Sequence, residues 1–145
     1  MKVNGTYQIP APPERVWQVL LDPEFIRHAI PGCEEMVRET ENVYRIQMKA
    51  GLGAIKSSFS GEVRLEQMRP PEHYRMVTSA KGMAGFVNGS GDIDLKPKNG
   101  ATEVNYSGDL QVGGMLAAVG SRMVEAAFRK SVNDFFAAVT REVSA

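Results

Sequence analysis

The segment from Val87 to Val112, VNGSGDIDLKPKNGATEVNYSGDLQV, alternates between two kinds of residue on both sides of the dipeptide Asn99-Gly100. Apolar or small residues occupy every second position, and polar or charged residues lie between them. This period of two predicts two strands, because successive side chains of a strand point to opposite faces. The Asn-Gly pair predicts a tight hairpin turn between the strands. The segment therefore predicts an antiparallel sheet with one polar face and one covered face.

The same alternation dominates the chain from residue 35 to residue 112, with a further turn predicted at RPPE, residues 69–72. An N-terminal strand is predicted over residues 2–9. Two short helices are predicted in residues 11–30, because prolines favour the first turn of a helix and the pair Pro31-Gly32 ends the second one. The sequence therefore predicts one strand, two short helices and a long antiparallel meander.

The C-terminal residues 115–143 predict one long helix after Gly113-Gly114. Its apolar side chains recur at three- and four-residue steps and form a stripe, made of Val124, Phe128, Val132, Phe135, Phe136, Val139 and Val143. Leu116, Val119, Met123 and Ala127 widen it. Such a stripe must be covered, and the concave face of the sheet is the obvious partner. The fold class is therefore α+β: a curved meander sheet wrapped around a long C-terminal helix, in a single domain spanning residues 1–145.

The inward positions of the predicted strands carry no charged side chain. They carry all four tyrosines of the chain, Tyr7, Tyr44, Tyr74 and Tyr106. They also carry Gly5, Gly61, Gly89, Gly91 and Gly108. Glycine weakens a strand interior, so these positions need a reason. Two reasons stay open: the glycines let the sheet curve around the helix, or they leave room for a ligand.

The bulk composition excludes some classes of function. Seventeen basic residues balance seventeen acidic ones, which argues against a nucleic-acid partner that is held by its phosphates. One cysteine cannot form an internal disulfide, which fits a reducing cytosol. No apolar run approaches the roughly 20 residues of a membrane-spanning helix. We expect a cytoplasmic protein, with peripheral contact at the inner face of the cell membrane as an open alternative.

No catalytic constellation is recognisable. Cys33 has no histidine at metal-ligand spacing, and we expect its thiol to pack at the edge of a pocket. His73 falls on the outward positions and is predicted to be solvated. General acid–base chemistry needs a titratable group that reaches the ligand, and the inward strand positions supply only tyrosines. An enzyme is therefore disfavoured, although helices and loops could still contribute Glu34, Glu35 or Arg122.

Three stretches resemble a known family: residues 11–36, APPERVWQVLLDPEFIRHAIPGCEEM, residues 85–91, GFVNGSG, and residues 113–136, GGMLAAVGSRMVEAAFRKSVNDFF. They are similar to the CoxG family of carbon monoxide dehydrogenase, within the START/Bet v-type (SRPBCC) superfamily. The resemblance implies a helix-grip fold and a non-catalytic accessory of a molybdenum hydroxylase such as carbon monoxide dehydrogenase. It also implies membrane association and a cavity for a lipid or an isoprenoid quinone.

The sequence and the resemblance together predict binding of a hydrophobic molecule, menaquinone, ubiquinone or a lipid, between the sheet and the C-terminal helix. Neither a metal nor a covalently bound cofactor is expected. The predicted lining residues are Phe25, Ile30, Met36, Met48, Phe59, Met76, Met83, Phe86, Leu116, Val119 and Met123. Residues 82–86 and 25–32 are expected to form the mouth. Two alternatives stay open: a cyclase- or hydrolase-type enzyme acting on an apolar substrate, and a docking protein that recruits the dehydrogenase to the membrane.

Overall fold

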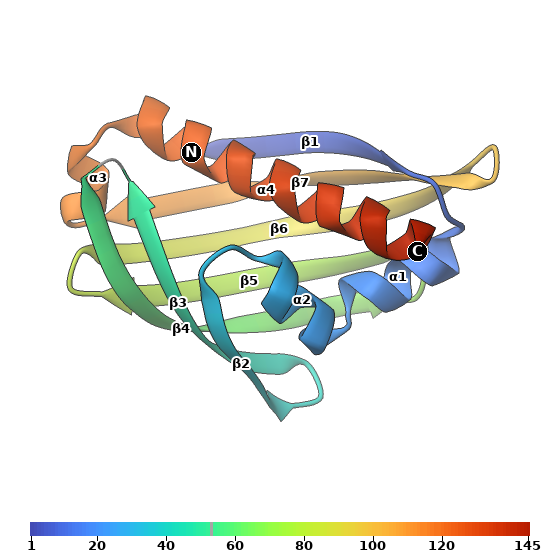
Figure 1. Cartoon of the computed structure of the whole chain (residues 1–145), viewed down its shortest axis with the longest axis horizontal. Helices are drawn as coiled ribbons and strands as arrows, with labels where there is room; N and C mark the ends of the chain where they lie inside the picture. Colours follow the sequence, from blue (N-terminus) through green and yellow to red (C-terminus); the bar gives the residue numbers. More distant parts are fainter. Residues whose placement is uncertain (53) are drawn as a thin grey trace.

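The computed structural model describes residues 1–52 and 54–145. The elements follow in the order β1 (Lys2–Ile9), α1 (Pro13–Leu20), α2 (Pro23–Ala29), β2 (Cys33–Thr40), β3 (Val43–Leu52), β4 (Ile55–Arg69), β5 (His73–Gly82), β6 (Gly85–Lys98), β7 (Ala101–Gly113), α3 (Met115–Ala118) and α4 (Ser121–Ser144). The strands form one antiparallel sheet in the order β1-β7-β6-β5-β4-β3-β2. Helix α4 runs diagonally across its concave side (Figure 1). The predicted fold class is confirmed.

The hairpin of β6 and β7 follows the predicted pattern. The two strands pair from Phe86 opposite Gly113 to Lys98 opposite Ala101. At the turn, Asn99 has φ +53° and Gly100 has φ +84°, the left-handed backbone that Asn-Gly adopts most readily. Strand β1 pairs with β7 along its whole length, so the meander is extended at one edge by the N-terminal strand.

The predicted single helix over residues 115–143 is wrong in one respect. It is divided into α3 and α4 at Gly120, which has φ +97°. A residue with a side chain adopts this conformation at a cost, whereas glycine does so freely. Helix α3, before the break, contributes Leu116 to a buried apolar cluster, and α4 begins at Ser121. No helix among the described residues is long and apolar enough to cross a membrane.

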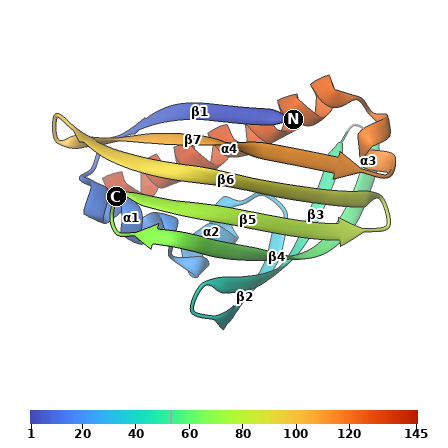
Figure 2. The same ribbon diagram turned by 180° about the vertical axis from the view of Figure 1, so that it is seen from behind.

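Most of the buried apolar side chains form two separate clusters on the concave side of the sheet, and Ile46 and Val124 are buried outside both. The larger, here the main core, contains Ile9, Ala11, Val16, Val19, Leu20, Tyr44, Leu65, Tyr74, Ile93, Leu95, Val104, Phe136 and Val139. The smaller, here the tip core, contains Phe59, Ala80, Ala84 and Leu116. The main core lies under α1 and the C-terminal half of α4, and the tip core lies beside α3, at opposite ends of the sheet (Figures 1 and 2).

Candidate functional site

Outside the two cores, several inward residues of the sheet are only half-buried, although Ile46 on the same face is buried. We call these residues the central strip: Met48, Thr78, Gly89, Gly91, Gly108 and Leu110. Five of them are neighbours across β5, β6 and β7, since Thr78 lies opposite Gly89, Gly89 opposite Leu110, and Gly91 opposite Gly108. Met48 lies apart from these on β3, opposite Phe59 of the tip core. The strip offers methyl groups, methylenes and one hydroxyl, and it carries no charge. Its chemistry suits an apolar molecule lying against the sheet.

The inward glycines do not share one role. A Cβ added at Gly61 would lie 2.1 Å from the carbonyl oxygen of Ser79, and one at Gly108 would lie 2.2 Å from that of Ser90. At Gly91 the nearest backbone oxygen would be 2.9 Å away. Backbone therefore fills the space that a side chain would need, which is the signature of a strongly curved sheet. These three glycines support curvature.

The two remaining inward glycines differ from those three. At Gly5 an added Cβ would lie 2.6 Å from the ring of Tyr106, so this glycine makes room for an aromatic side chain. At Gly89 the nearest atoms would be Leu110 Cδ1 at 3.6 Å and the Asp109 oxygen at 3.7 Å, which are ordinary contacts. Only Gly89, of the inward glycines, leaves space above the sheet that a side chain could fill.

A row of aromatic rings holds α4 over the strands β1 and β7. The ring of Phe136 stacks on Tyr7 with centroids 4.4 Å apart, and Tyr7 lies 6.3 Å from Tyr106. Phe128 meets Tyr106 edge-on at 6.2 Å. Aromatic pairs in these geometries contribute beyond their buried area. The row therefore fixes one side of α4 to the sheet, alongside the central strip.

Three of the inward tyrosines, Tyr7, Tyr74 and Tyr106, remain protonated at neutral pH. The Tyr7 hydroxyl donates a hydrogen bond to the Asn133 side chain on α4. Burial raises the pKa of Tyr7, Tyr74 and Tyr106, and the nearby guanidinium of Arg129 opposes this rise at Tyr7 and Tyr106. These hydroxyls can donate hydrogen bonds but are poor general bases.

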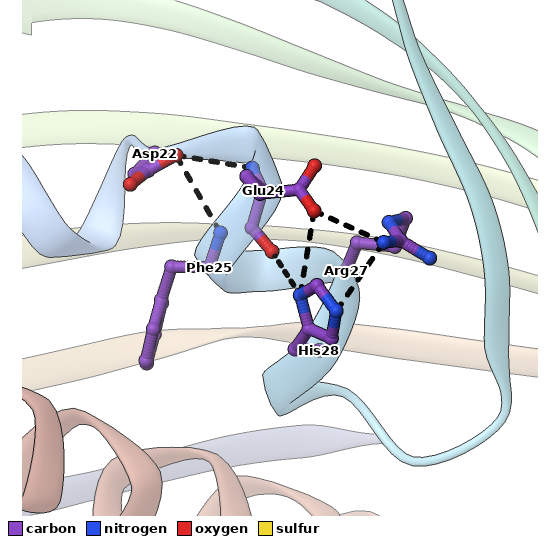
Figure 3. Close-up of polar contacts among 5 residues, drawn as sticks. All are labelled: Asp22, Glu24, Phe25, Arg27 and His28. Carbon is purple, nitrogen blue, oxygen red and sulfur yellow. Dashed lines mark hydrogen bonds and ion pairs between the residues drawn. The ribbon is translucent and has the colours of Figure 1, made fainter.

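Helix α2 has one polar and one apolar side, and Figure 3 shows both. Asp22 caps the helix by accepting hydrogen bonds from the backbone amides of Glu24 and Phe25. Glu24 pairs with Arg27 at 3.0 Å and lies 3.7 Å from His28. Phe25 points away from this cluster, and its ring lies 6.1 Å from that of Phe135 on α4. The cap and ion pairs thus present the apolar side of α2 to α4.

The structure places most of the predicted lining residues on the concave side. Phe25, Met36 and Met76 pack against the main core. Phe59 and Leu116 belong to the tip core. Met48 lies in the central strip, and Ile30 and Val119 are half-buried at the ends of α2 and α3. That these side chains contact a ligand stays a prediction. Thr78 and Leu110 also lie in the central strip but are not among the predicted lining residues, although the alternation of the strands predicts that both point inward.

Three predicted lining residues do not face the space between sheet and helix. Met83 is 99% exposed at the turn between β5 and β6. Val87 packs against the tip core on the inner face. Because adjacent side chains of a strand point to opposite faces, the Phe86 ring lies on the outer face, against Gly113. Met123 is 44% exposed, since it lies about 100° around the helix from the buried Val124. These side chains belong to the surface.

The prediction that His73 is solvated is wrong. The side chain faces outward, yet the residue is only 7% exposed. Its Nδ1 lies 2.8 Å from Asp94, and its Nε2 lies 3.7 Å from Asp92, which also pairs with Arg75 at 3.0 Å. These partners come from the adjacent strand, where Asp94 lies opposite His73. The cluster is on the convex face, away from the central strip.

Cys33 is half-buried at the start of β2, as expected of a packed thiol. Its Sγ lies 3.7 Å from the carbonyl oxygen of Glu35. Burial raises the pKa of this thiol, which keeps it protonated and weakly nucleophilic at neutral pH. Among the described residues, no group of three or more His, Cys, Asp or Glu side chains is arranged to hold a metal ion.

Two surface grooves lie along α4, outside the concave face. One, of about 580 Å³, is lined by Arg122, Glu125, Ala126, Arg129, Lys130, Asn133 and Asp134. The other, of about 330 Å³, lies between α2 and α4 and is lined by His28, Ala29, Pro31, Asp134, Ala137, Ala138 and Arg141. Charged and polar side chains form most of the first lining. Neither groove contains a predicted lining residue, although the second includes His28, Ala29 and Pro31 from the predicted mouth. They do not correspond to the expected apolar site.

A curved antiparallel sheet gripping a long C-terminal helix, with an uncharged inner face, defines the helix-grip, START-like class of proteins. The chain is similar in structure to a START superfamily protein from Mycobacterium smegmatis (TM-score 0.75, 13% identity, 99% of this chain and 97% of that chain). It is also similar to the Zhui aromatase/cyclase from Streptomyces sp. R1128 (TM-score 0.70, 14% identity, 99% and 93%). At these identities the likeness shows the fold.

The family is narrower than the fold. The family model of CoxG, a carbon monoxide dehydrogenase subunit, matches residues 5–144. The chain therefore belongs to the CoxG family. It is also similar to a conserved protein from Geobacillus kaustophilus, with a TM-score of 0.95 and 30% identity over 99% of this chain and 95% of that one. No curated protein matches the sequence.

Proposed function

We propose that this protein binds a hydrophobic small molecule, an isoprenoid quinone or another lipid, against the central strip beneath α4. In this proposal it is a non-catalytic carrier that serves a molybdenum hydroxylase such as carbon monoxide dehydrogenase. It works at the inner face of the cell membrane and links the enzyme to the membrane quinone pool. Membership of the CoxG family supports the enzyme partner.

One observation carries the ligand proposal. On the inner face outside the two cores, the residues of the central strip are uncharged and half-exposed, whereas Ile46 beside them is buried. Apolar surface left in water costs about 25 cal/mol per Å² relative to its burial. A quinone ring or an isoprenoid chain lying on Gly89 and Leu110 would cover that surface. Thr78 would supply a hydroxyl for a carbonyl oxygen.

The same inner face favours a carrier over an enzyme. Besides the tyrosines, this face has the thiol of Cys33, opposite Met48, and the guanidinium of Arg38, over the Tyr44 ring at the β2 edge. Burial raises the pKa of Tyr7, Tyr74, Tyr106 and Cys33, which keeps these four groups protonated. A protonated phenol can hold a quinone or ketone oxygen by a hydrogen bond. It cannot readily remove a proton at neutral pH, as a cyclisation or a hydrolysis requires.

The experiment is a titration of the purified protein with menaquinone and ubiquinone analogues, followed by calorimetry and by mass spectrometry of solvent extracts. Gly89→Leu is the informative variant, because its Cβ has room and its side chain would occupy the strip. We expect it to weaken binding at least about tenfold, since overfilling a packed apolar site costs about 1–3 kcal/mol.

The matched control is Ser90→Leu, which adds the same side chain one residue later, on the outer face. It should bind the quinone as the wild type does. Absence of quinone or lipid both from extracts and from the titration contradicts the proposal. Equal weakening by both variants would move the ligand away from the central strip.

A further inference from the structure

Exposed apolar side chains gather at one end of the molecule. Met83 is 99% exposed, Met115 is 58%, Met123 is 44% and Phe86 is 37%. They come from the turn between β5 and β6, from α3 and from the start of α4, which lie together at the left end of Figure 1 and the right end of Figure 2. We call this end the tip. Large side chains of this kind in one place mark an interaction surface.

Contacts within the fold hold α3 and the turns β3–β4 and β5–β6 together at the tip. The Leu116 amide donates a 3.0 Å hydrogen bond to the carbonyl of Ala84, which joins α3 to the β5–β6 turn. Leu52 and Ile55, which flank the β3–β4 turn, pack against the tip core formed by Ala84 and Leu116. The exposed methionines therefore project from a packed base.

The charge of the tip is predominantly positive, and Glu125, which follows it on α4, pairs with Arg129. Residues 50–57, 80–87 and 112–124 contain Lys56, Lys81 and Arg122 and no Asp or Glu, although the whole chain has zero net charge. All three cations are exposed, and none forms an ion pair with a described residue. Unpaired cations around flexible apolar side chains match an anionic lipid surface, where apolar groups enter the interface and cations meet phosphates.

We propose that the tip docks on an anionic lipid bilayer, with Met83 and Met115 entering the interface and Lys56, Lys81 and Arg122 contacting the headgroups. A second copy of the chain fits the tip less well, because a symmetric tip-to-tip contact would bring like charges together. This docking deepens the proposed function and rests on it in one respect, because it assumes that the bilayer supplies the ligand. The tip core and α3 lie at one end of the central strip, so a docked tip would place that end of the strip near the bilayer.

The test is flotation of the full chain with vesicles of phosphatidylcholine alone or with 30% phosphatidylglycerol, a composition chosen to give about one anionic lipid in three. The wild type should bind the anionic vesicles and release them at about 1 M salt, where screening is nearly complete. The double variant Met83→Ser/Met115→Ser should bind about tenfold more weakly. Lys56→Gln/Lys81→Gln should lose about fivefold per cation.

The control is Lys96→Gln, an exposed cation near the opposite end of β6, which should float like the wild type. Equal flotation of all variants, or none by the wild type, overturns the proposal. So does a wild-type dimer in sedimentation that the tip variants abolish, because the tip would then be a self-association surface. Quinone binding by the tip variants in detergent separates the two proposals: if it persists while flotation fails for the wild type, only docking is contradicted.

Discussion

The two ends of the sheet bury their apolar residues to different degrees. At the main core, Val16, Val104 and Val139 are fully buried beneath α1 and α4. At the tip, only four residues form the core, two of them alanines, while Met83 and Met115 are exposed to solvent. Burial of apolar area is the main source of stability. The end with the main core therefore contributes most of the stability, whereas the tip keeps large apolar side chains exposed.

The largest expected effect tests the main core. Phe136→Ala removes a ring that is 6% exposed and stacks on Tyr7, and it should lower the free energy of unfolding by about 3–5 kcal/mol. Phe86→Ala, at the outer face of the tip, should cost about 1 kcal/mol or less. Urea denaturation measures both. Similar losses from the two variants would contradict the division into a stabilising end and an open end.

The next effect separates glycines that curve the sheet from the one that leaves room. Gly61→Ala places a methyl group against the backbone of Ser79 and should destabilise the protein by about 1–3 kcal/mol. Gly89→Ala meets only ordinary contacts, so its free energy of unfolding should stay within about 1 kcal/mol of the wild type. If the two variants unfold at the same denaturant concentration, the inward glycines do not differ in this way.

The smallest effect concerns pH and the main core, which contains Tyr74. Burial raises the pKa of this hydroxyl in the folded protein, so its neutral form is favoured by folding. The stabilisation is complete below about pH 10, the pKa in the unfolded chain, and it is lost as pH rises from there towards the folded pKa. At pH 11 the loss should be on the order of 1 kcal/mol.

Tyr74→Phe should remove that part of the alkaline loss, as measured by denaturation at pH 9 and pH 11. Tyr74 is the suitable position because it is 4% exposed. An unchanged difference between the two pH values in the variant would show that another group causes the alkaline sensitivity.

Much of this protein follows from its sequence by local rules. The alternation from residue 35 to 112, the Asn99-Gly100 turn and the apolar stripe of residues 124–143 determine a meander sheet and a helix that must cover it. The uncharged inner face follows from the same period of two, because a pleated strand sends alternate side chains to opposite faces. The family resemblance was readable in residues 11–36 and 113–136, and the family model confirms it.

The tertiary structure determined which side chains are covered, which the alternation of the sequence alone does not determine. The alternation along the strand predicts that His73 points to the outer face, but only the pairing of β5 with β6 shows that it is buried there against Asp94. The sequence places glycines at inward positions. Only the packed backbone shows that a neighbouring strand occupies the space above Gly61, whereas the space above Gly89 is open. The left-handed backbone of Gly120 divides the predicted helix, and the meeting of the β5–β6 turn, α3 and the start of α4 forms the tip. Local periodicity determines which face a side chain takes, whereas contacts between distant segments determine whether that face is covered.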